Sequence, residues 1–141
     1  MESNAINWCK ILIYGSVLFF AQFAIGFAEG WFSPGVNDTN HIKIVLLFVL
    51  STLTSLFVCT SIFAHMAIYQ ASRPYLHACL SLFLCGAAFF GLSAVLEPLL
   101  GSAPTLLIYF GWLTDITGLF AGVLIGRAIS RKHAGNQEGV A

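Results

Sequence analysis

The sequence predicts an all-α membrane protein in which four transmembrane helices form an antiparallel up-down bundle, with both termini in the cytoplasm. Three observations predict this class. Of the 141 residues, 58% are hydrophobic and only 9% are charged, whereas soluble domains carry about 25% charged residues. Four apolar runs are each long enough to cross a hydrocarbon core, which takes about 20 residues. The basic residues gather on one side of the resulting topology.

The apolar runs form a single domain over residues 1–132, and the spans are predicted at about 8–29, 42–68, 74–97 and 104–126. Lipid offers no partner for backbone N–H and C=O groups, so continuous apolar runs of this length predict helices. They lack the alternating pattern of barrel strands. Residues 133–141 are polar and contain glycine, and we expect them to form a disordered cytoplasmic tail.

The four prolines mark the ends of the runs: Pro34, Pro74, Pro98 and Pro104. Pro34 lies in the first break. Proline suits the first turn of a helix, so Pro74 and Pro104 should begin the third and fourth helices. Pro98 should end or kink the third helix, because proline removes a backbone donor and clashes with the preceding turn.

The positions of lysine and arginine give the orientation. One side of the topology holds Lys10, Arg73, Arg127, Arg131 and Lys132, and the other holds only Lys43. Basic residues are enriched in cytoplasmic segments, which predicts an N-in, C-in, multi-pass protein. Compact loops favour the bacterial inner membrane. An alternative is that residues 1–28 are a cleaved signal peptide, but the apolar stretch exceeds the usual h-region of ~7–15 residues.

Small residues indicate where the helices touch, because helices in lipid associate through close backbone approach. In the fourth span Gly118, Gly122 and Gly126 recur every four residues. Gly111 and Asp115 fall on the same face, within an arc of about 80°. We expect helix packing at these four glycines and, in the first span, at Gly15 and Gly26.

Asp115 is the most informative residue, because it lies midway along the fourth span. An acid at that depth costs about 2.5–3.5 kcal/mol on insertion scales. No lysine or arginine shares its depth, so we expect a carboxyl that is neutral for much of the time and donates to Gln22, Ser51, Thr54 or a water. Two interpretations stay open: a proton or cation site made of Asp115, Gln22 and Thr54, or a structural hydrogen bond between helices.

Enzyme motifs are absent, since the sequence has no G-x-S-x-G, H-E-x-x-H, P-loop or G-x-G-x-x-G. We therefore expect a protein that is not an enzyme, needs no cofactor or metal, and contacts the lipid bilayer. Six basic and six acidic residues cancel, so nucleic acid is not an expected partner. The favoured hypothesis is that the protein acts by helix packing, as a homo-oligomer or with a membrane-protein partner.

Two alternatives to the packing hypothesis remain. The first is a small proton-coupled exporter or cation carrier that uses Asp115. The second is a membrane-embedded redox or lipid enzyme that uses Cys59, Cys79 or Cys85, although the sequence has no C-x-x-C pair.

Overall fold

The computed structural model describes residues 6–32, 41–70, 72–100 and 105–138, and four helices account for nearly all of them. The helices are α1 (Trp8–Phe32), α2 (His41–Tyr69), α3 (Pro74–Leu100) and α4 (Thr105–Glu138). Each contains 25 or more consecutive residues that are apolar enough to cross a membrane. The all-α class and the four apolar helices suited to membrane spanning are therefore confirmed.

Two predicted helix ends differ from the structure. Helix α4 continues to Glu138, through most of the segment 133–141 that we expected to be disordered. This part contains alanine, glutamine and glutamate, which are good helix formers, and no proline. Helix α3 does not end at Pro98 but includes it and ends at Leu100. Proline has no backbone N–H, so the carbonyl four residues before Pro98 lacks its helical hydrogen bond. This close to the helix end, that is the only bond lost.

Pro74 begins α3, as predicted; Pro34 and Pro104 lie outside the described residues. Directly before Pro74, Arg73 has a φ of 49°, a left-handed conformation that is uncommon for a residue other than glycine. The Arg73 carbonyl accepts from the backbone N–H of His77 at 3.2 Å and lies 3.1 Å from His77 Nδ1. The backbone N–H of Asn7 donates to His77 Nε2 at 3.1 Å. The buried His77 thus links the start of α1 to the turn between α2 and α3.

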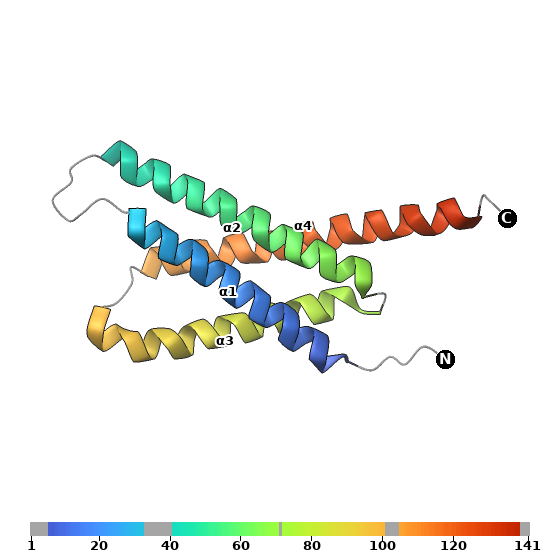
Figure 1. Cartoon of the computed structure of the whole chain (residues 1–141), viewed down its shortest axis with the longest axis horizontal. Coiled ribbons are helices and arrows are strands. Elements are labelled where there is room, and N and C mark those ends of the chain that lie inside the picture. Colours follow the sequence, from blue (N-terminus) through green and yellow to red (C-terminus); the bar gives the residue numbers. More distant parts are fainter. Residues whose placement is uncertain (1–5, 33–40, 71, 101–104, 139–141) are drawn as a thin grey trace.

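Successive helices point in opposite directions along the long axis (Figure 1). The most extensive contacts, however, join α2 to α4 and α1 to α3. Gly118 lies on Cys59 and Gly122 on Phe63, so residue numbers rise together and the α2/α4 pair is parallel. In a bundle with short loops, consecutive antiparallel helices are the usual neighbours. The expected antiparallel packing is found only at the smaller interfaces, α1/α2, α3/α4 and α2/α3, whereas the two largest interfaces join parallel helices.

Glycine is what allows α4 to approach α2 so closely. A Cβ on Gly122 would lie 2.5 Å from the Thr60 carbonyl oxygen, and a Cβ on Gly126 would collide with the Ala64 carbonyl oxygen. Gly15 packs in the same manner against Ser81 and Leu84 of α3. Four of the six glycines expected at helix contacts therefore lie against another helix of the same chain.

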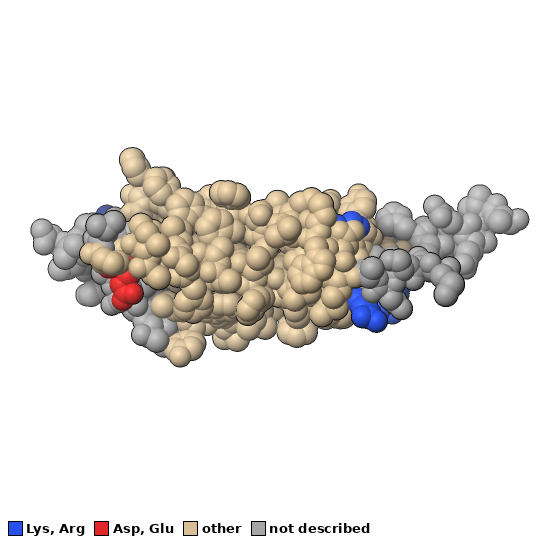
Figure 2. All heavy atoms as spheres, turned by 90° about the horizontal axis from the view of Figure 1, so that it is seen from below, with Lys and Arg blue, Asp and Glu red and all other residues tan. Residues whose placement is uncertain are grey.

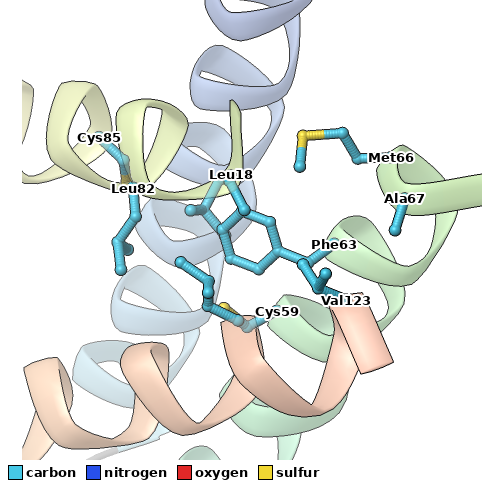
Figure 3. Close-up of a cluster of buried hydrophobic side chains, with 10 residues drawn as sticks. Leu18, Cys59, Phe63, Met66, Ala67, Leu82, Cys85 and Val123 are labelled. Carbon is cyan, nitrogen blue, oxygen red and sulfur yellow. The ribbon is translucent and has the colours of Figure 1, made fainter. Parts of the chain in front are cut away.

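The molecule is packed tightly at one end and loosely at the other. We define the terminal half as residues 6–18, 59–86 and 118–132, and the distal half as residues 19–32, 41–58, 87–100 and 105–117. Within the ranges whose side chains are described, every buried residue belongs to the terminal half. Figure 3 shows Phe63 at the centre of that core, between Leu18 of α1 and Val123 of α4. In the distal half α2 and α3 diverge (Figure 1).

The outer surface is apolar between two charged ends. Large side chains such as Trp31, Phe57 and Ile42 are 76%, 73% and 80% exposed, an arrangement suited to lipid rather than to water. On the face in Figure 2, lysine and arginine gather mainly at the terminal end, acidic side chains and a small basic area lie at the distal end, and the surface between the two ends is uncharged. This pattern matches a protein whose middle lies in hydrocarbon.

Candidate functional site

A chain of polar side chains crosses the bundle at mid-depth. Gln22 Nε2 on α1 donates to Asp115 Oδ1 on α4 at 2.8 Å. Ser55 Oγ on α2 donates to Gln22 Oε1 at 2.9 Å. The backbones of α1 and α4 do not approach each other within the described segments. Gln22 therefore reaches across the bundle, and its hydrogen bonds link α1 to α4, whose backbones do not meet, as well as to α2.

The same register produces a second polar pair nearer the distal end. Glu29 lies seven residues after Gln22 on α1, and Ser51 lies four residues before Ser55 on α2, so each pair shares a helix face. Because α1 and α2 run antiparallel, Ser51 meets Glu29, and Ser51 Oγ donates to Glu29 Oε2 at 2.8 Å. Polar side chains thus continue from Asp115 to the distal end of the bundle.

These side chains line an open groove of about 210 Å³ between α1, α2 and α4. Its polar lining residues, which define what we call the polar groove, are Gln22, Glu29, Ser51, Thr52, Ser55 and Thr114. Gly26 and Gly111 also line it, and a Cβ on either would meet no atom within 4 Å. A water needs a share of about 30 Å³ and two to four polar partners, so the polar groove has room and partners for several waters.

A second cavity, of about 310 Å³, lies between α3 and α4. Its walls, which define the aromatic cavity, include Cys85, Phe89, Phe90, Ser93, Trp112 and Asp115. Gly111 lines both spaces. Asp115 accordingly contributes to the wall of the aromatic cavity while its Oδ1 accepts from Gln22, a residue of the polar groove.

Below Asp115 the bundle is closed. Leu119, one turn further along α4, is only 2% exposed, and Phe63 and Leu18 are fully buried. Cys59 Sγ donates to the backbone carbonyl of Asp115 at 3.5 Å, a normal length for a sulfur donor. Asp115 therefore lies at the boundary between the sealed terminal half and the open distal half.

The structure brings together two of the three residues proposed for a transport or proton site. Gln22 and Asp115 are hydrogen-bonded, but Thr54 is exposed and donates to its own helix, at the Leu50 carbonyl. Ser55 occupies the place expected for Thr54. The expected direction is reversed at Gln22, which donates to Asp115, and Ser51, another expected partner of Asp115, donates to Glu29 instead. The polar face of α2 was visible in the sequence, but its rotation toward α1 depends on the distant α2/α4 contact.

The aromatic wall was not predicted. Phe89 and Phe90 follow each other on α3, and Trp112 lies on α4, so no sequence spacing links them. Trp112 packs over Gly86, where any Cβ would collide with the indole ring. The only signal in the sequence was a small residue on α3 opposite an aromatic residue on α4, which cannot be paired without knowing the register.

The charge of Asp115 is not balanced by a basic residue along its own helix. The nearest one, Arg127, follows twelve residues later, or about 18 Å along the axis. In the described part of the chain, His, Cys, Asp and Glu nowhere form a group of three that would hold a metal ion. The cysteines are free thiols, with Cys59 and Cys85 buried and Cys79 exposed. Asp115 is the carboxyl in the wall of the aromatic cavity, and Glu29 is the carboxyl in the polar groove.

A carboxyl in this setting has two chemical uses. It can take up and release a proton through waters in the polar groove, or it can bind a cation as a carboxylate, and the Gln22 donor fits the carboxylate.

No family model matches the sequence, and neither the curated proteins nor the solved structures give a significant match.

Proposed function

We propose that this protein is a non-enzymatic carrier of protons or cations in a bacterial inner membrane, with both termini in the cytoplasm, and that Asp115 binds the cargo. One observation carries the proposal: Asp115 lies where the open distal half meets the sealed terminal half, beside both the polar groove and the aromatic cavity. Under this topology, a cargo on the outer side has a path to Asp115 that ends there.

The energetics of burial support a functional acid. A carboxyl at mid-depth costs about 2.5–3.5 kcal/mol on insertion scales, whichever role it has. A hydrogen bond to Gln22 would be made as well by an uncharged asparagine. Water in the polar groove lowers the cost of charging Asp115, so this acid can change its protonation state where a dry structural contact could not.

The packing also provides bodies that can move. Helices α1 and α3 form one closely packed pair, and α2 and α4 form the other, with smaller interfaces between the pairs. Rigid-body motion of one pair against the other is an established way to switch a membrane site between two sides. Opening the terminal half would separate Leu18 of the first pair from Phe63 of the second.

Action through packing with a second copy or another membrane protein is less well supported. The sequence motivated it by Gly118, Gly122 and Gly126, and these glycines pack against α2 of the same chain. Oligomerisation and a membrane partner remain predictions that these glycines do not favour.

Proton flux into proteoliposomes tests the carrier proposal. A pH gradient is imposed across vesicles that hold the protein and a fluorescent pH indicator, and the Asp115→Asn variant is compared with the unchanged chain. Asparagine preserves size and one hydrogen-bonding oxygen, so folding should be retained. We expect flux to fall to the level of empty vesicles in this variant and to persist in the control Glu97→Gln, which alters an exposed acid at the distal end. Equal flux with and without Asp115 would remove the proposal.

A further inference from the structure

We propose that the aromatic cavity binds a monovalent organic cation with an apolar body, and that its positive charge lies against Asp115. This inference rests on the proposed function, because it names the cargo class of the same site. It is carried by the presence of one carboxylate and three aromatic rings in the wall of a single cavity, which is lined by Phe89, Phe90, Trp112 and Asp115.

Two of the three rings, Phe89 and Trp112, pack against neighbouring helices, whereas Phe90 is 63% exposed. The rings of Phe90 and Trp112 lie 6.4 Å apart at an interplanar angle of 34°. Phe89 is braced from behind by Phe19 of α1, with ring centroids 4.8 Å apart. The faces of such rings attract a cation within about 6 Å, and aromatic cages recognise quaternary ammonium groups in this way. An apolar body would at the same time be shielded from water.

The charge of the cargo follows from the lining residues. Asp115 is the only carboxylate among the lining residues, and neither lysine nor arginine contributes to them. Gln22 donates to the Asp115 carboxylate but does not balance its charge, so a neutral or anionic cargo would leave the carboxylate without a counter-ion at mid-depth, which is costly. One carboxylate balances one positive charge, so a monovalent cation is the complementary cargo.

Bare metal ions fit this cavity poorly. Calcium takes six to eight oxygen ligands, and magnesium requires near-octahedral oxygen coordination. Asp115 and Ser93 are the only lining residues whose side chains carry oxygen. An organic cation does not need such a shell, because its charge is spread over alkyl or aryl groups that the rings can contact.

The volume sets an approximate size for the cargo. Ligand pockets usually measure about 300–1,000 Å³, and at about 310 Å³ the aromatic cavity lies at the lower end. Gly111 lines both this cavity and the polar groove, and a Cβ on it would meet no atom within 4 Å. A compact cation fits this volume, whereas a molecule several times larger would extend beyond the cavity.

Binding should be coupled to the loss of a proton. When the cation enters, the Asp115 carboxyl gives its O–H proton to water in the polar groove, and the carboxylate that remains pairs with the cation. One proton leaves for each monovalent cation that binds, so the net charge at mid-depth does not change. The same exchange, reversed on the other side, would couple cargo movement to proton movement.

Binding of benzyltrimethylammonium to the whole chain in lipid nanodiscs tests the proposal. Neopentylbenzene is the matched control, because it has the same shape with carbon in place of the charged nitrogen. We expect saturable binding of the cation above that of empty nanodiscs, release of about one proton per cation, and at least tenfold weaker competition by the neutral compound. This comparison needs no variant, so misfolding cannot imitate it.

Variants then locate the site. Asp115→Asn should weaken binding by at least about tenfold, and Trp112→Leu by about two- to thirtyfold. Gly111→Leu should block entry by filling the open space, whereas Thr54→Val, outside the aromatic cavity, should bind normally.

Absence of saturable binding, equal competition by neopentylbenzene, or unchanged binding in Asp115→Asn would each overturn the proposal. If binding is absent while Asp115-dependent proton flux persists, the cargo class is wrong and the carrier stands. Binding without flux would support the cavity and reject the carrier.

Discussion

Replacing Gly122 by alanine should force α4 away from α2 and destabilise the protein. The new Cβ would lie 2.5 Å from the Thr60 carbonyl oxygen and 2.8 Å from Phe63 Cβ. Neither atom is the free end of a flexible side chain. Restoring an ordinary contact of 3.4 Å to the carbonyl oxygen requires the helices to separate by about 0.9 Å. A gap of about 0.5–1 Å forfeits a quarter to a half of the dispersion energy of each affected contact.

The expected magnitude comes from two opposing effects. Overpacking costs about 1–3 kcal/mol, and rigid backbone atoms place Gly122 in the upper part of that range. Alanine regains up to about 1 kcal/mol because it favours a helix more than glycine does. We therefore expect the free energy of unfolding to fall by about 1–2 kcal/mol.

Reversible unfolding in mixed micelles of dodecylmaltoside and sodium dodecyl sulfate measures the difference, with far-UV circular dichroism as the probe. Gly111→Ala is the matched control on the same helix, because a Cβ there meets no atom within 4 Å. It should be neutral or stabilise by up to about 1 kcal/mol. If Gly122→Ala proved as stable as Gly111→Ala, the close α2/α4 contact would be incorrect.

Three further substitutions test the polar contacts in the same unfolding assay. Gln22→Leu should lower the free energy of unfolding by about 1–3 kcal/mol, because Asp115 loses its donor. In a double-mutant cycle, most of that cost should disappear when Asp115 is already leucine, and an undiminished cost would contradict the contact. Thr54→Val should change stability by less than about 0.5 kcal/mol, since the threonine serves only its own helix, and a larger loss would place Thr54 back in the site. His77→Ala should cost about 2–4 kcal/mol, because it removes a buried ring and the acceptor of the Asn7 N–H; a neutral result would mean that the N-terminal contact does not hold in the membrane.

Sequence alone predicted the features that depend on composition and depth. The four helices follow from apolar runs that no soluble fold would accommodate, and Asp115 and Gln22 could be matched because both lie near the middle of their spans. The contact between Glu29 and Ser51 could not be predicted, because it requires the register between α1 and α2.

Features set by long-range packing could not be predicted. Gly111 shares a helix face with Gly118 and Gly122, yet only the latter two touch α2, because the helices diverge in the distal half. Whether Thr54 or Ser55 meets Gln22 depends on the rotation of α2, which the glycine contacts of α4 determine. The parallel pairing of alternate helices also escaped prediction, because short loops favour consecutive neighbours.

The infrared absorption of the Asp115 carboxyl in lipid bilayers tests most directly whether this acid exchanges with water. Difference spectra between the unchanged chain and Asp115→Asn isolate its carbonyl stretch while the pH of the bathing solution is varied. We expect the band of the protonated acid to fall reversibly as the pH rises, and to fall at constant pH when benzyltrimethylammonium is added. A band that is constant from acidic to alkaline pH and insensitive to the cation would show a sealed structural bond, contrary to a carrier site.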